Sequence, residues 1–223
     1  MASIQFIPIG FRQTNDICLL ASFSFVLGYY KKLENEALEE ISVYNVCDKY
    51  MQYLLQLPEN AIIRQNMEAD YISLFNENDQ IVNVNNYELF VSMQLHNYCH
   101  GRNIRGLNHI KAYDDYLYRE GDDIRCHNFR IDDRDVVTGI IPIPEAPAII
   151  MRHLDDNENN LAMIVYQTQR GGHTVLVGRN NLNGEYFFRD PNNDNISNVC
   201  SHVNLSLSDM HTISEYVLFS SII

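Results

Sequence analysis

The chain has 223 residues, of which 46% are hydrophobic and 20% are charged, a composition typical of a globular protein with a sizeable core. Its 29 acidic and 16 basic residues give a formal charge of -13, so the average surface repels a nucleic-acid backbone or an anionic membrane. We therefore expect no nucleic-acid partner and favour a neutral or basic protein or peptide.

Cysteine usage and the absence of apolar targeting segments indicate where the chain works. The cysteines are irregularly spaced and form no close pair, which predicts neither a disulfide framework nor a zinc ribbon: Cys18, Cys47, Cys99, Cys126 and Cys200. No basic segment followed by a long apolar core opens the chain, and no run approaches 18 apolar residues. We expect no signal peptide or membrane span, and a location in the cytoplasm or, after export by another route, inside a host or target cell.

The first elements are a short strand and a buried helix. Residues 4–9 alternate as a strand does, and Pro8 favours a sheet edge. Residues 13–30 begin with polar side chains and continue as an uncharged apolar run, which predicts a core helix with Asn15 or Asp16 as its N-cap. Cys18 then lies in the first turn, where the helix dipole favours the nucleophilic thiolate.

The chain continues with helices and then changes character near Gly121. Helical spacing of apolar residues predicts helices over 34–57, 87–98 and 108–117, with Asn-rich loops around 76–86. Short β-rich runs follow at 140–143, 148–151, 162–167, 174–178, 186–188 and 216–221. We predict an α+β fold in a single domain, with a mainly helical lobe over about 11–120 packed against an antiparallel β-sheet lobe over about 121–223.

Two other constellations compete with a cysteine site. By residue type, one group in the segment 96–109 offers possible metal ligands: His96, Cys99, His100 and His109. Its spacing contains no second tight pair, and no lysine follows Gly171 and Gly172 as a phosphate loop requires. We therefore expect no metal and no cofactor.

His173 and Asp190 are paired by the alternation of side chains along strands. If 172–179 and 186–190 form a hairpin, any register whose paired residue numbers sum to an odd value puts both side chains on one face. A sum of 363 sets them directly opposite, and 365 makes them diagonal neighbours within reach of an imidazole and a carboxylate. Asn192 and Asp194 are the alternatives to Asp190. Gly171 and Gly172 would let a substrate backbone approach His173.

With Gln13 five residues before Cys18, the order Gln, Cys, His, Asp resembles the papain-like cysteine peptidases, especially the bacterial bacteriocin-processing peptidase-like branch and related injected effectors. The resemblance covers about 40 residues. It implies a papain-like fold, a catalytic triad of Cys18, His173 and Asp190, and an oxyanion role for Gln13. The chain departs from the pattern at Leu19, where papain has tryptophan and the bacteriocin-processing branch has glycine. It also has about 150 residues between cysteine and histidine, which indicates an enlarged helical lobe.

These residues predict a thiol-dependent hydrolase, with a cysteine protease as the first interpretation. His173 would take the proton of Cys18 or hold it in an ion pair, Asp190 would orient the ring, and the thiolate would attack an acyl carbon to form a thioester. The Gln13 amide and the Cys18 backbone N–H would hold the oxyanion. The same intermediate serves a glutamine deamidase or an acyl transferase, including a bacterial effector or toxin, and a non-enzymatic binding module is a further alternative.

Overall fold

The computed structural model describes residues 17–34, 41–102, 106–168, 171–179, 184, 186–191 and 212–223. Within these ranges helices come first and an antiparallel sheet follows, so the α+β class predicted from the sequence is confirmed. The strand expected over residues 4–9 and the N-cap candidates Asn15 and Asp16 lie outside the described residues. None of the described helices combines the length and the hydrophobicity that crossing a bilayer requires.

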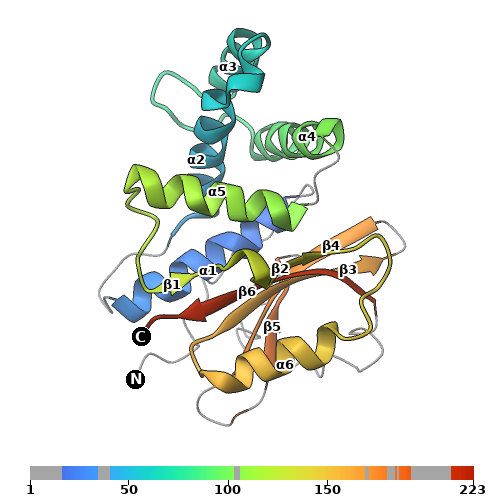
Figure 1. Ribbon diagram of the computed structural model, residues 1–223. Helices are drawn as coiled ribbons and strands as arrows, with labels where there is room; N and C mark the ends of the chain where they lie inside the picture. Colours follow the sequence, from blue (N-terminus) through green and yellow to red (C-terminus); the bar gives the residue numbers. More distant parts are fainter. Residues whose placement is uncertain are drawn as a thin grey trace.

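The helix α1 (Cys18–Glu34) is the central element that the apolar run predicts. Every residue from Leu19 to Tyr30 is buried. On one side α1 is covered by β3 (Leu161–Thr168) and β4 (Gly171–Arg179) of the sheet, and on the other by α2 (Val43–Gln56) and α5 (Gly106–Glu120). The helix begins at Cys18, so this residue occupies the first turn as expected. Figure 1 shows α1 between α5 and the sheet.

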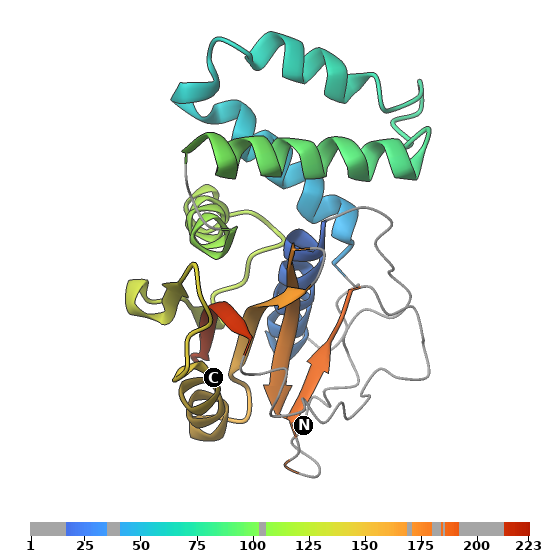
Figure 2. The ribbon, with the colours of Figure 1, turned by 90° about the vertical axis from the view of Figure 1, so that its right-hand side faces the viewer.

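Four further helices follow: α2 (Val43–Gln56), α3 (Arg64–Ile72), α4 (Val84–Arg102) and α5 (Gly106–Glu120). The Ser42 hydroxyl caps α2 by accepting the Tyr44 N–H at 3.2 Å, and Pro58, which opens a short 3-10 turn (Pro58–Asn60), stops its continuation. Helices are confirmed within 34–57, 87–98 and 108–117, but α2 begins only at Val43, after the non-helical residues 41–42, and α4 begins at Val84, inside the expected loop. The polar α3 was not predicted. Both views place α2, α3 and α4 at the end of the molecule opposite α6 (Ala146–Asp156) (Figure 1 and Figure 2).

The second half supplies a six-stranded sheet with the order β1-β6-β3-β4-β5, and β2 pairs with β6. A short 3-10 turn, Asp133–Asp135, precedes β2. The strands are β1 (Phe129–Arg130), β2 (Val136–Thr138), β3 (Leu161–Thr168), β4 (Gly171–Arg179), β5 (Tyr186–Arg189) and β6 (Ile213–Ser221). All pairings are antiparallel, as expected.

The sheet is covered on both faces, and the alternation of its side chains separates two apolar clusters. Leu161, Met163 and Leu176 belong to the large cluster built around α1 and the helical half. Ala162 and Val175 belong to a smaller cluster with the apolar side of α6 (Ala146–Asp156). Covering on both faces explains why β3 and β4 are almost continuously hydrophobic.

The expected strands at 140–143 and 148–151 are wrong. Residues 139–145 form an irregular connection, and 148–151 lie inside α6. Ala146, Ile150 and Leu154 recur at four-residue spacing and bury one helical stripe against the sheet. A short apolar run is ambiguous between strand and buried helix, and here the packing of that stripe selects the helix.

Candidate active site

Cys18 lies at the N-terminus of α1 beside the part of the β4 edge that precedes the pairing of β4 with β5. In the described residues, β5 pairs with β4 only from Leu176 to Arg179, so the β4 edge before Leu176 is left without this partner strand. Side chains of α1 take its place: the Ser22 hydroxyl donates to the Thr174 carbonyl at 3.2 Å, and the Thr174 N–H donates to the Cys18 sulfur. Cys18 and Ser22 are four residues apart and therefore share one face of α1.

His173 and Asp190 lie together as the strand parity predicts. The numbers of paired residues on β4 and β5 sum to 365 throughout, for example Leu176 with Arg189, so the odd register is confirmed. The His173 Nε2 atom and the Asp190 Oδ1 atom are 2.7 Å apart, a distance expected for a charge-assisted hydrogen bond. Asn192 and Asp194, the alternative partners, lie outside the described residues.

The Cys18 sulfur hydrogen-bonds to the His173 ring, which completes a chain of three interacting side chains. Burial by itself raises the pKa of the Cys18 thiol, but the His173 hydrogen bond, the Thr174 N–H and the His173 charge lower it to below its ordinary value. Burial likewise opposes the charged form of His173, yet the contacts with Asp190 and Cys18 raise its pKa to about 9. The two pKa values move in opposite directions, which favours the thiolate–imidazolium pair over the neutral thiol and imidazole.

Two aromatic contacts hold the neighbouring strands in place. The Tyr166 ring meets the His173 ring edge-on, with centroids 5.5 Å apart, and limits how the imidazole can rotate. The Arg189 guanidinium lies 5.0 Å from the centroid of the Phe25 ring, so the residue before Asp190 is anchored on α1. These contacts fix β4, β5 and α1 relative to one another around the three side chains.

Thr174, Ser22 and Tyr166 were not identified from the sequence. The only local signal was the i, i+4 spacing of Cys18 and Ser22, which has a meaning only once α1 is known to lie along the β4 edge. Gln13, expected to help hold the oxyanion, lies outside the described residues. Its role stays a prediction.

Gly172 has a role in the sheet that the sequence did not indicate. A Cβ atom at this position would lie 2.9 Å from the Val165 Cγ1 atom of the neighbouring strand, closer than real side chains approach. The packing of β4 beside β3 is therefore enough to require glycine at position 172. The close approach of a substrate backbone stays a prediction.

The histidines considered as metal ligands are distributed over different environments. His109 is buried and lies 2.6 Å from the Tyr50 hydroxyl, whereas the His96 and His100 rings stack on the exposed side of α4 with centroids 5.5 Å apart. Cys99 is half-buried. Across the described ranges, no three His, Cys, Asp or Glu side chains gather as a metal ion would need.

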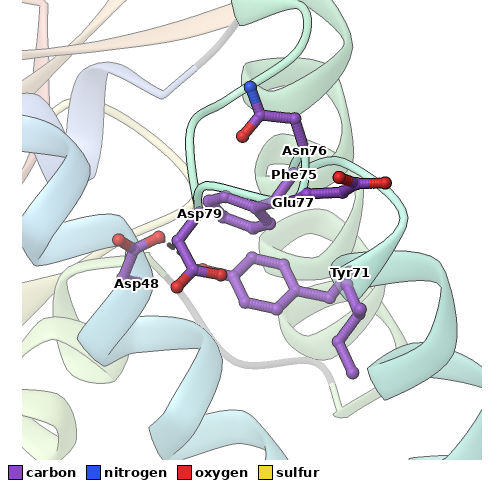
Figure 3. Close-up of a pocket in the computed structure, with 7 residues that line it drawn as sticks. Asp48, Tyr71, Phe75, Asn76, Glu77 and Asp79 are labelled. Atoms are coloured by element: carbon purple, nitrogen blue, oxygen red, sulfur yellow. Dashed lines mark hydrogen bonds between the residues drawn. The ribbon is translucent and has the colours of Figure 1, made fainter.

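A cavity of about 550 Å³ lies in the helical half, away from Cys18, and is lined by Asp48, Tyr71, Ile72, Phe75, Asn76, Glu77 and Asp79. The Tyr71 and Tyr87 hydroxyls both donate to the Asp48 carboxylate, and Figure 3 shows the Tyr71 ring lying across the cavity toward Asp48. Its described lining contains no cysteine or histidine. This cavity therefore offers a framework of tyrosine–carboxylate contacts and no nucleophile.

No family model, curated protein or solved structure matches this chain. The functional argument therefore rests on the chain's own residues and geometry.

Proposed function

We propose that the chain is a thiol-dependent hydrolase of papain-like architecture, acting first of all as a cysteine protease through Cys18, His173 and Asp190. The observation that carries the proposal is the hydrogen-bonded series from the Cys18 sulfur through the His173 ring to the Asp190 carboxylate, at a helix N-terminus. A nucleophile, a base and an orienting acid in mutual contact are what acyl transfer through a thiol requires.

The proposed reaction uses each side chain at a stated atom. The Cys18 thiolate forms a bond to the acyl carbon of the substrate, and the carbonyl electron pair moves to the oxygen, held by the Cys18 N–H and, by the resemblance, by Gln13. The imidazolium of His173 then protonates the leaving amine as the carbon–nitrogen bond breaks. Water attacks the thioester with His173 as base, which releases the acid and restores the thiol.

Asp190 and Thr174 prepare the site before the substrate arrives. With its Nε2 atom engaged by Asp190, the His173 ring presents its other nitrogen to the sulfur, so the carboxylate sets both the orientation and the charge of the ring. The Thr174 N–H stabilises the thiolate directly. A neutral or basic peptide is the expected substrate because the chain carries a formal charge of -13.

The test is exposure of the purified chain to a decapeptide library, with the products read by mass spectrometry. Chain cleavage supports the protease, a gain of about one dalton without cleavage identifies a deamidase, and conjugation to an added amine identifies a transferase. Cys18→Ala should abolish the reaction and leave the melting temperature within a few degrees of the unaltered chain, since Cys18 is only half-buried.

Cys99→Ala is the matched control, because Cys99 is also a half-buried cysteine outside any disulfide but lies on α4. It should retain full activity. Activity that survives in Cys18→Ala would contradict the proposal. A thiol-reactive peptide probe that labels no cysteine, together with no product, would favour the binding-module alternative.

A further inference from the structure

The connection between β2 and α6, residues 139–145, exposes two adjacent aliphatic side chains. Ile140 is 83% exposed and Ile141 is 73% exposed. Leaving such a side chain in water forgoes roughly 1.5–3 kcal/mol of burial. Two adjacent exposed aliphatic side chains are therefore a candidate binding surface.

Backbone hydrogen bonds to β6 hold this connection so that Ile140 and Ile141 remain exposed. The Gly139 N–H donates to the Ser214 carbonyl and the Ile143 N–H donates to the Ile213 carbonyl, each at 2.8 Å, so both ends are attached to β6. The Ile143 side chain packs with the cluster beneath α6. Pro142 and Pro144 further restrict the backbone, so Ile140 and Ile141 are presented outward in a pre-arranged segment.

This segment lies at the same end of the sheet as the candidate active site. His173 on β4 is paired with Tyr166 on β3, Tyr166 is paired with Ile213 on β6, and Ile213 accepts the hydrogen bond from Ile143. Neighbouring strands are about 4.8 Å apart, so three such steps put Ile143, at one end of this segment, roughly 14 Å from His173. Figure 1 shows the connection running from β2 around to α6.

We propose that Ile140 and Ile141 form an apolar lip that binds an aliphatic or aromatic side chain of an extended peptide substrate. An extended chain advances about 3.3 Å per residue, so roughly 14 Å corresponds to about four residues between the bound side chain and the substrate residue beside His173. The paired residues form a continuous row across the sheet from His173 to Ile143. We therefore assign the lip to the same substrate on which His173 acts. The inference rests on the proposed function and adds to it a preference for a hydrophobic residue at that distance.

The experiment compares the decapeptides cleaved by the unaltered chain with those cleaved by the double variant Ile140→Ser/Ile141→Ser. The unaltered chain should enrich Leu, Ile, Phe or Met about four residues from the reactive bond on one side. For a peptide with that residue, the double variant should lower kcat/KM roughly 10-fold through KM, the size expected of one hydrophobic contact. With serine at that position, the two proteins should not differ.

Ile62→Ser is the matched control, since Ile62 is 96% exposed in the helical half, and it should leave the preference unchanged. A double variant that keeps the full preference would overturn the lip while leaving the proposed hydrolase intact. No product from the unaltered chain would instead contradict the proposed function. Light scattering tests the alternative that a second copy of the chain binds these side chains. A dimer that dissociates in the double variant would assign Ile140 and Ile141 to self-association and overturn the inference.

Discussion

His173 carries the pH dependence of the proposed reaction. Its pKa is raised to about 9, mainly by the Asp190 hydrogen bond against the opposing effect of burial, while the pKa of Cys18 is lowered. Both shifts favour the thiolate–imidazolium pair, and kcat/KM should fall as the pH rises through about 9, where His173 loses the proton that the leaving group needs.

Asp190→Asn should move this alkaline limb to lower pH by about one unit or more, because the amide accepts the ring hydrogen bond but carries no charge. Asp190→Ala should lose more turnover than Asp190→Asn, since it also loses the ring's partner. Asp194→Ala is the control and should leave the profile unchanged. Profiles of kcat against pH and of kcat/KM against pH compare all three variants. If the alkaline limb shifts in the Asp194 variant and not in the Asp190 variants, Asp194 is the acid that orients His173.

At the scale of elements, Ser22 joins α1 to β4 at the site. Its hydroxyl donates to the Thr174 carbonyl at 3.2 Å, whereas the equally buried Ser24 hydroxyl donates within α1, to the Ala21 carbonyl. Ser22→Ala should therefore lower kcat several-fold and lower the reactivity of Cys18 toward iodoacetamide, because the helix loses its attachment beside Thr174.

Ser24→Ala is the matched control for Ser22→Ala. Each substitution removes one buried hydrogen bond and should reduce the free energy of unfolding by about 1 kcal/mol. Only the Ser22 variant should change the alkylation rate of Cys18. Equal rates in the two variants would show that this attachment does not position the sulfur.

At the scale of the whole molecule, a buried ion pair connects the helical half with the sheet. The Arg125 Nε atom lies 2.7 Å from the Asp114 Oδ1 atom, both side chains are 4% exposed, and the guanidinium lies 3.6 Å from the centroid of the Phe129 ring. Asp114 belongs to α5 and Phe129 to β1, so Arg125 bridges the two halves. Burial raises the pKa of Asp114 even though Arg125 opposes the shift.

Arg125→Met should reduce the free energy of unfolding by about 3–5 kcal/mol, because it leaves the Asp114 carboxylate buried without its cation. Urea unfolding followed by circular dichroism measures the loss. Arg134→Met removes a partner from the exposed Arg134–Asp132 pair and should leave the urea midpoint nearly unchanged. Comparable losses in both variants would contradict the assigned role of the buried pair.

Short-range patterns in the sequence predicted the helix and the strands that carry the candidate site. The uncharged run after Asp16 predicts α1 with Cys18 in its first turn, and alternation along two strands limits His173 and Asp190 to one face in any odd register. Both inferences depend on periodicity within a short segment, which the sequence displays directly. The run at 148–151 was misassigned because four apolar residues do not separate a strand from a buried helix, and only their packing beneath the sheet does.

The tertiary structure alone decided what surrounds the three side chains. Thr174 reaches Cys18 because β5 stops pairing at Leu176 and α1 lies along the edge it leaves open, a relation between segments about 150 residues apart. The position of Ile140 and Ile141 at the active-site end depends likewise on how β2, β6 and β3 are ordered in the sheet. Such contacts arise from strand order and from helix packing, and no periodicity within one segment encodes which distant segment will lie beside it.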